Sequence, residues 1–230
     1  MNLIDLIFPK KCVNCAKSGD YVCANCLPFI SFDVKNLCLV CDKPTYNSLT
    51  HPKCKSRYSI DGCFSAISYN KIARKLIFNF KYKPYLSDLK TFLSELFVES
   101  IIQNEQFMKL IANGEWLMAP VPLYGSKLRK RGYNQAEILS IALSKKLNIP
   151  VQNLLVRLKD TKSQFKLTKE ERKENIKEAF ELDDRSLKLE ARNIFLVDDV
   201  VTTGSTLKEA ANVLKRAGAK VVFGLTLARD

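Results

Sequence analysis

Residues 194–206 have the sequence Ile-Phe-Leu-Val-Asp-Asp-Val-Val-Thr-Thr-Gly-Ser-Thr, and this stretch decides the fold. The apolar run that begins at Asn193 predicts a strand over 193–199, and the VTTGS that follows predicts a loop. A helical pattern over 206–217 ends before Gly218, and KVVFGLTLA predicts a second strand. A strand, a helix and a strand in this order form a βαβ unit with parallel strands. The sequence therefore predicts an α/β fold with a mainly parallel sheet flanked by helices.

Two carboxylates and a hydroxyl-rich loop follow the first of these strands. Asp198 and Asp199 stand at its predicted C-terminal end, where open α/β sheets bind ligands. Neighbouring strand residues point to opposite faces, so a bend is needed for both acids to accept hydrogen bonds from the two cis hydroxyls of one ribose. The loop and the helix that it opens offer backbone N–H groups, hydroxyls and a positive dipole end to one phosphate. We expect the phosphate contacts to come from Val201, Thr202, Thr203, Gly204, Ser205 and Thr206.

Other phosphate-binding and acidic motifs fit this stretch less well. The Walker A loop needs a lysine after its glycine, and the dinucleotide motif G-x-G-x-x-G is also absent. The two acids could bind Mg²⁺ directly, but this interpretation leaves the TTGST loop unexplained. They could also only cap the next helix. The clamp for a ribose 5-phosphate accounts for both parts of the stretch.

The segments between residues 63 and 180 supply the rest of the predicted domain. FSAISY predicts a strand, KIARKLIFNFKY a helix capped by Asn70, residues 86–103 a second amphipathic helix, and WLMAPVP a buried strand. Residues 136–147 predict a helix and 151–158 an extended segment. Thr168 and Glu171 form a capping box for a helix that reaches about Ala179. Pro120 and Val121 end a strand near the expected site and could shape a turn for a diphosphate, or could simply terminate the strand.

The basic residues of the chain are concentrated near the predicted site. The formal net charge is +13, and residues 120–177 hold 14 basic and 5 acidic residues, a local excess of nine positive charges. Such a surface favours phosphate-rich ligands or nucleic acid, with Arg129 and Arg131 beside Lys127 and Lys130 as candidate phosphate ligands. Tyr124, Tyr133 and Phe165 could stack bases, and residues 159–172 could cover the ligand. The plain alternative is a solvated basic face.

Seven of the eight cysteines lie within the first 54 residues, where they predict metal sites. Cys12, Cys15, Cys23 and Cys26 form two CxxC pairs that can hold one tetrahedral Zn²⁺. Cys38 and Cys41 form a third pair, and His51 with Cys54 completes a second set. The alternatives are a crossed pairing of the four pairs, or only one occupied site. Both sets have the residues of closed, structural sites, which supply folding energy to a segment with few apolar residues. Cys63 is expected to be a buried apolar residue instead.

The chain shows no apolar run of transmembrane length, and its first residues lack the features of a secretory signal. We therefore expect a protein without a membrane span, located in the cytoplasm, where thiols stay reduced. The change in composition predicts two domains, a zinc-ribbon module over 1–62 and an α/β domain over 63–230.

The motifs resemble those of two related groups of proteins. IFLVDDVVTTGST resembles the phosphoribosyl-diphosphate signature of type I phosphoribosyltransferases, which implies that Asp198 and Asp199 hold the ribose and that the loop holds the 5-phosphate. Nearly the whole chain resembles the ComF family, including its GntX-like members. The matching pieces are the LIFPKKCVNC start, the double zinc ribbon, FKY at 80–82, APVPL at 119–123, RKRGYNQA at 129–136, and Ser163, Gln164, Glu171, Arg172, Asn175, Ala179 and Phe180. His51, in place of a ribbon cysteine, departs from the pattern and puts the second zinc in question.

The resemblance implies a competence protein that binds phosphoribosyl diphosphate, together with Mg²⁺, and takes part in DNA uptake by contacting single-stranded DNA and other uptake proteins. A second hypothesis is an active phosphoribosyltransferase that acts on a nucleobase or related nitrogen nucleophile. The sequence assigns no catalytic acid or base to that reaction. A third hypothesis, a zinc-dependent nucleic-acid binder with a vestigial transferase fold, conflicts with the intact acid and loop motif.

Overall fold

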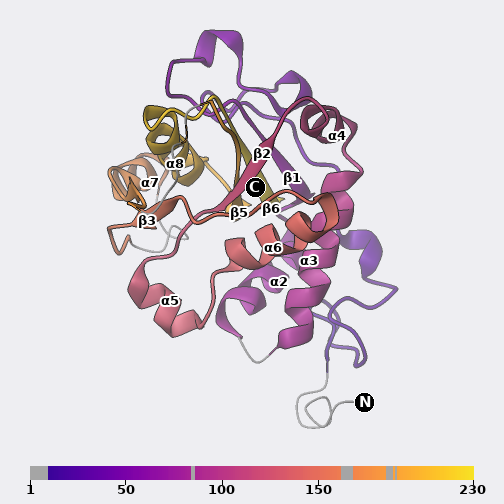
Figure 1. The fold of residues 1–230 in the computed structure, drawn as a ribbon. Helices are drawn as coiled ribbons and strands as arrows, with labels where there is room; N and C mark the ends of the chain where they lie inside the picture. The colour runs from indigo at the N-terminus through magenta and orange to yellow at the C-terminus, as the bar shows by residue number, and fades with distance from the viewer. Residues whose placement is uncertain (1–9, 84–85, 162–167, 185–188, 190) are drawn as a thin grey trace.

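The computed structural model describes residues 10–83, 86–161, 168–184, 189 and 191–230 (Figure 1). Residues 6–9 of the LIFPKKCVNC piece, and Ser163, Gln164 and Phe165, lie outside these residues. The elements are β1 (Gly62–Ser68), α2 (Lys71–Tyr82), α3 (Ser87–Ile102), α4 (Glu105–Ile111), β2 (Trp116–Pro120), α5 (Gly125–Arg131), α6 (Gln135–Leu147), β3 (Leu155–Arg157), α7 (Lys169–Ile176), β4 (Phe180–Leu182), β5 (Asn193–Val201), α8 (Ser205–Arg216) and β6 (Val221–Arg229). Short 3₁₀ turns occupy Leu27–Phe29, Tyr46–Ser48 and Pro52–Cys54.

A parallel sheet with strand order β1-β6-β5-β2 forms the centre of the molecule. In the pairing of β5 with β6, Val197 is opposite Leu225 and Asp198 is opposite Thr226. Strands β3 and β4 form a separate antiparallel pair. The predicted fold class is therefore confirmed, since β5, α8 and β6 form the predicted βαβ unit.

Helices cover both faces of the sheet (Figure 1). On one face α2, α3, α4 and α6 pack over side chains such as Phe195 and Phe223. On the other face α8 packs over Leu196 and Val222, together with residues of α7 and β4. Because both faces are covered, β5 is apolar at consecutive positions, which is typical of a buried parallel strand.

Helices α2 and α7 begin at the residues that the sequence predicts as their caps. The Asn70 side chain accepts hydrogen bonds from the backbone N–H groups of Ile72 and Ala73, so α2 begins as predicted. Thr168 and Glu171 form the predicted capping box of α7. That helix ends at Ile176, three residues before the predicted end, because the chain turns at residues 177–179 into β4.

Three elements and one boundary depart from the predictions. The sequence predicts no element at α4, α5 or β4, all of seven residues or fewer. The strand predicted over 193–199 continues through Val200 and Val201, which pair with Ala228 and Arg229 of β6. The acids are therefore inside the strand and not at its end. Long-range pairing with β6 overrides the local turn signal.

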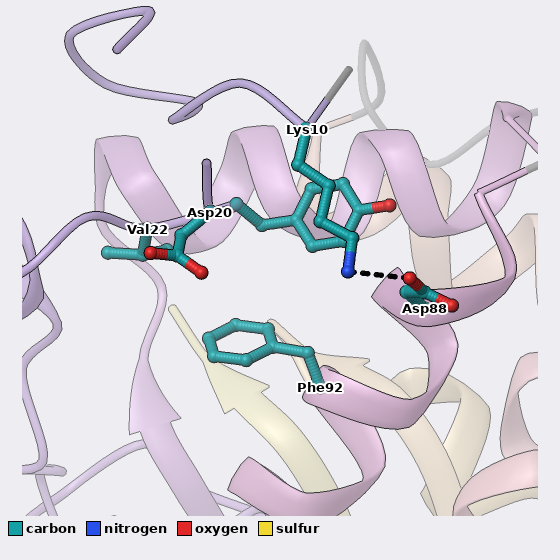
Figure 2. A pocket seen from close by; sticks show the side chains of 6 residues that line it. Lys10, Asp20, Val22, Asp88 and Phe92 are labelled. Atoms are coloured by element: carbon teal, nitrogen blue, oxygen red, sulfur yellow. Dashed lines mark ion pairs between the residues drawn. The ribbon is translucent and has the colours of Figure 1, made fainter. Parts of the chain in front are cut away.

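The segment before β1 packs on both sheet faces and shares their cores. Tyr21, Val22 and Ile30 join the core on the α2 and α3 face, while Leu39 and Ile60 join the core beneath α8. Where the first part of this segment meets α3, a small pocket lies between Lys10, Asp20, Tyr21, Val22, Asp88 and Phe92 (Figure 2). Two of these residues form an ion pair, in which Lys10 Nζ lies 2.6 Å from Asp88 Oδ2. The domain boundary at residue 62 stays a prediction.

Within the described residues, no helix is both long and apolar enough to span a bilayer.

Candidate phosphate site and metal centres

Asp198 and Asp199 make contacts on opposite faces of β5. Asp199 is 8% exposed, and its Oδ2 lies 2.7 Å from Nζ of Lys81, at the end of α2. The half-buried Asp198 accepts a 2.8 Å hydrogen bond from the backbone N–H of Asp199. The positive charge of Arg157, from β3, stabilises the ionised form of Asp198. Each acid therefore has a basic residue nearby, and each basic residue comes from a different element.

Burial, reinforced by the negative charge of Asp199, raises the pKa of Asp198 from its ordinary value of 3.8 to about 7. Lys81, the hydrogen bond from the Asp199 N–H and Arg157 act in the opposite direction but do not cancel this effect. Near neutral pH the pair therefore carries less than two full negative charges. A cation or a hydroxyl donor placed beside Asp198 would favour its ionised form.

Asp198→Asn is expected to stabilise the folded protein above pH 7. The folded state holds the Asp198 proton more tightly than the unfolded state, so this group makes the wild type lose stability as pH rises from about 4 to about 7. Asparagine does not ionise, and the variant should be more stable at pH 8 by on the order of 1–2 kcal/mol, with a smaller difference at pH 6. Urea unfolding of both proteins at the two pH values measures this. Equal stabilities at pH 8 would contradict the assigned pKa.

The loop after β5 forms the N-terminus of α8. Gly204 has a φ of +67°, a left-handed conformation that glycine adopts without strain, and it is the N-cap residue. The Thr203 and Ser205 hydroxyls lie 2.9 Å apart, and Ser205 is buried. Arg172 of α7 donates a 2.8 Å hydrogen bond from Nη1 to the Thr202 hydroxyl. This arrangement places hydroxyls, a helix N-terminus and a guanidinium together, which suits an anion.

Pro120 and Val121 lie at the C-terminal end of β2, level with Val197 of β5, which directly precedes the two acids. Pro120 pairs with Val197 of β5, and the Val121 N–H donates to the Val197 carbonyl at 2.9 Å. Asn134 then donates from Nδ2 to the Val121 carbonyl. The turn after β2 is therefore held beside the residue that precedes Asp198.

Arg129 and Arg131 are on α5, not in a loop, and they differ in surroundings. Arg129 is exposed, whereas the guanidinium of Arg131 lies 5.4 Å from the centre of the Tyr82 ring and donates to Gln135 Oε1 at 2.9 Å. These contacts place Arg131 beside the end of α2, the helix that also carries Lys81. Among the described residues, neither arginine forms a hydrogen bond with the loop of residues 202–206. Their role as phosphate ligands stays a prediction.

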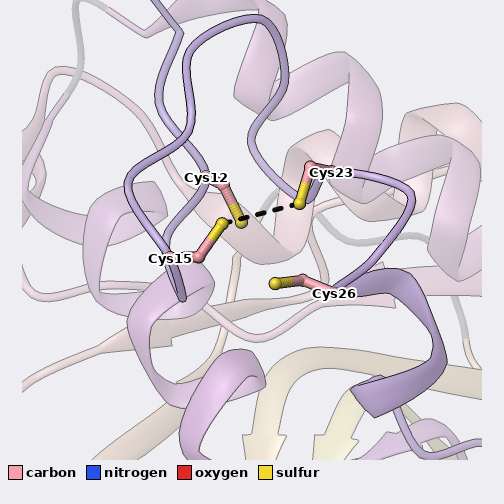
Figure 3. Close-up of side chains that lie close together, drawn as sticks. All are labelled: Cys12, Cys15, Cys23 and Cys26. Carbon is pink, nitrogen blue, oxygen red and sulfur yellow. Dashed lines mark hydrogen bonds between the residues drawn. The ribbon is translucent and has the colours of Figure 1, made fainter.

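The first cysteine group brings together Cys12, Cys15, Cys23 and Cys26, whose sulfur atoms all lie within 4.8 Å of one another (Figure 3). Cys15 Sγ and Cys23 Sγ are 3.6 Å apart, and Asn14 Nδ2 donates to Cys26 Sγ at 3.4 Å. Three of the four cysteines are buried. Four converging thiols with no other ligand among them fit a closed, structural Zn²⁺ site.

The second group contains Cys38, Cys41, His51 and Cys54, again within 4.8 Å. His51 Nδ1 lies 3.2 Å from Cys41 Sγ, and Nε2 lies 2.9 Å from the Pro44 carbonyl. A carbonyl only accepts hydrogen bonds, so Nε2 carries the proton and Nδ1 keeps its lone pair towards the three sulfur atoms. The histidine that departs from the ribbon pattern therefore fits as a fourth ligand.

Cys63 belongs to neither group. It is 2% exposed on β1, and burial raises its pKa to about 11, so it is a buried apolar residue as predicted.

The sequence predicts no role at this site for Lys81 or Arg157, and it places Arg172 only at the end of the segment over 159–172 that could cover the ligand. Lys81 is in the FKY piece and Arg172 is among the single residues that match the family pattern, so this match was a usable signal for both. Arg157 is in a short strand with no motif around it. Contacts between distant elements bring all three to the acids and the loop, and local patterns do not encode such contacts.

Comparisons with known proteins agree with both halves of the chain. Residues 130–229 match the model of the phosphoribosyl transferase domain, and residues 3–55 match the double zinc ribbon domain. Competence protein F of Haemophilus influenzae is 43% identical over 111 residues, which are 48% of each chain. Competence protein ComFC of Bacillus subtilis is 26% identical over 225 residues, 93% of this chain and 86% of the relative.

The DNA utilization protein YhgH of Escherichia coli K12 is 41% identical over 103 residues, 44% of each chain. The matches thus span about half the length of the Haemophilus and Escherichia proteins and most of the Bacillus protein. With its matches to a double zinc ribbon and a phosphoribosyl transferase domain and with these relatives, the chain is similar to competence protein F along about half of its length and to competence protein ComFC along most of it.

Proposed function

We propose that this protein binds phosphoribosyl diphosphate at the end of β5 and takes part in DNA uptake. The first part rests on one observation. Two acids, a glycine-capped loop with hydroxyl groups, and the basic residues Lys81, Arg157 and Arg172 lie together near the C-terminal end of β5. The phosphoribosyl transferase match over residues 130–229 includes the acids and the loop. The printed names of the relatives, competence and DNA utilization proteins, support the second part.

In this proposal the loop from Thr202 to Thr206 binds the 5-phosphate and the acids bind the ribose hydroxyls. Because the two acids make contacts on opposite faces of β5, their joint binding of one ribose requires the strand to bend at the acids when the ligand binds. Lys81 now neutralises Asp199, so a ribose would share or replace that ion pair. Mg²⁺ would bind with the ligand and offset the negative charge of a diphosphate beside two carboxylates. Asp198, with its raised pKa, would become ionised as the cation binds.

Calorimetric titration with phosphoribosyl diphosphate, with and without Mg²⁺, tests this site. We expect measurable binding that strengthens with Mg²⁺, and weaker binding of ribose 5-phosphate, which lacks the diphosphate. Absence of binding under all of these conditions would refute the proposal. Binding of free diphosphate as tightly as the whole ligand would refute the ribose role of the acids.

A surface beside this site supports a contact with single-stranded DNA. Phe78 and Tyr82 of α2 are 56% and 45% exposed, and their ring centres are 4.8 Å apart. Arg131 lies against the Tyr82 ring. Neither α2 nor α5 contains an acidic residue, and together they carry the basic residues Lys71, Arg74, Lys75, Lys81, Lys127, Arg129, Lys130 and Arg131. Exposed rings among cations are the features with which proteins stack bases and bind a phosphate backbone.

Of the three rings expected from the sequence to stack bases, Tyr124 is half-buried just before α5, and Tyr133 fits this role less well. Tyr133 is half-buried, its hydroxyl donates to the Phe80 carbonyl, and Lys90 Nζ lies 3.7 Å from the ring centre. Phe165 lies outside the described residues. The structure therefore favours Phe78 and Tyr82 as the stacking rings.

Replacing Phe78 and Tyr82 with alanine is expected to weaken binding of a labelled oligothymidine by about tenfold or more, since stacking contributes about 1–3 kcal/mol per base. Phe29→Ala with Phe32→Ala is a matched control, because these rings are 61% and 55% exposed on the ribbon segment. Fluorescence anisotropy at several salt concentrations measures both. Equal losses in the two double variants, or none, would contradict the assigned surface.

A further inference from the structure

The second metal group is joined to the phosphate loop through the turn Cys38-Leu39-Val40-Cys41. The Asp42 N–H donates to the Cys38 carbonyl at 2.9 Å and the Cys38 N–H donates to the Lys43 carbonyl at 3.0 Å, so the chain is tightly folded around the two cysteines. Leu39, between them, is 1% exposed. Its side chain belongs to the core that contains Val201 and Leu207, the residues on either side of the loop.

Leu39 also contacts the loop at its glycine. A Cβ placed on Gly204 would lie 2.9 Å from Cδ2 of Leu39, closer than real Cβ contacts. The leucine side chain is therefore packed against the backbone of the left-handed N-cap residue. Any other residue at position 204 would have to displace it, in addition to the strain of its positive φ.

Lys208 of α8 connects the same two segments by hydrogen bonds. Its Nζ donates to the Leu39 carbonyl at 3.0 Å and to the Thr203 carbonyl at 2.9 Å. The Lys208 backbone N–H donates to the Gly204 carbonyl at 2.9 Å, within the first turn of the helix. One ammonium group thus joins the metal-binding turn to the loop that precedes α8.

We propose that the second zinc turn positions the phosphate loop, with Leu39 and Lys208 as the positioning residues. Three thiolates and His51 would fix the turn when Zn²⁺ is bound, and the turn would hold Gly204 and Thr203 in the conformation that receives a phosphate. The inference rests on the proposed binding of phosphoribosyl diphosphate. It goes beyond that proposal by coupling ligand affinity to the occupancy of one of the two metal sites.

The first metal group provides an internal comparison. Its contacts lead to α2, where Lys75 Nζ donates to the Val13 carbonyl at 2.7 Å, and Cys12, Cys23 and Cys26 join the core on the other sheet face. Linkage requires a ligand on the loop to strengthen metal binding at the coupled site. The Cys₃His site should therefore be protected by the ligand, and the Cys₄ site should not.

Metal release from the cobalt-substituted full-length protein tests this difference. Co²⁺ in a Cys₄ set and in a Cys₃His set absorbs at different wavelengths, so loss from each site to a chelator is followed separately. With phosphoribosyl diphosphate and Mg²⁺ present, we expect loss from the Cys₃His site to be about tenfold slower, within the usual range of coupling between sites. The rate of Co²⁺ loss from the Cys₄ site should be the same with and without the ligand.

Lys208→Met should abolish this protection and weaken ligand binding about tenfold, because it removes the shared ammonium. Lys215→Met is the matched control, since Lys215 is on the same helix and instead contacts Asp61 at 2.7 Å and the Lys220 carbonyl. Equal protection of both metal sites, of neither site, or persistent protection in Lys208→Met would overturn the coupling. Failure of the wild type to bind the ligand by calorimetry would overturn the proposed function and the coupling with it.

Discussion

Removal of zinc is expected to destabilise the whole protein and not only its first 54 residues. Tyr21, Val22 and Ile30 lie in the core beneath α2 and α3, and Leu39 and Ile60 lie in the core beneath α8. Loss of the metal releases the turns that hold these side chains, and their exposure costs about 1.5–3 kcal/mol for each large apolar residue. For a chain of this size, even 5 kcal/mol corresponds to a fall in Tm of about 10–20 °C.

Cys23→Ser measures this effect at a single site. Cys23 is 7% exposed within the first group, so its replacement should lower the zinc content from two ions to one and lower the Tm by at least about 10 °C. Cys63→Ala is the matched control, since Cys63 is also buried but lies outside both groups, and it should keep two zinc ions. Differential scanning calorimetry with metal analysis gives both quantities. A Cys23→Ser protein with normal zinc content and an unchanged Tm would refute the structural role of the first group.

The sequence predicted those elements whose signals are local. Helix α2 could be predicted from its apolar spacing and from Asn70, which caps it as expected. The unit from β5 to β6 could be predicted because an apolar run, a glycine loop and an amphipathic helix occur in direct succession. Such features depend on neighbours a few residues apart, which are visible in a single chain.

What could not be predicted depends on contacts between distant residues. The two final residues of β5 are in the strand only because β6 pairs with them. Helix α5 carries four basic residues in seven and no buried side chain, so no apolar periodicity marks it. The contact of Lys81 with Asp199 joins residues 118 positions apart, and the contact of Leu39 with Gly204 joins residues 165 apart. The chemistry of the site could therefore be read from one motif, but the residues that surround it could not.

Asp199→Asn is expected to weaken binding of phosphoribosyl diphosphate by about 100-fold. The carboxylate can accept hydrogen bonds from both ribose hydroxyls, and each bond to a charged group contributes about 1.5–3 kcal/mol. The amide keeps the shape of the side chain but loses its charge and one acceptor. Asp199 is only 8% exposed near the C-terminal end of β5, an interior strand of the sheet, so water replaces the lost contact poorly.

The variant also loses the ion pair with Lys81, so a loss of affinity must be separated from a loss of stability. Asp61→Asn is the matched control, because Asp61 forms an ion pair of the same 2.7 Å length with Lys215 and its side chain is 20% exposed, against 11% for Asp199. Both variants should lose about 1 kcal/mol of stability, but only Asp199→Asn should lose ligand affinity in calorimetric titration. If both bind as the wild type does, the acid at position 199 is a structural partner of Lys81, and the ribose must be held elsewhere.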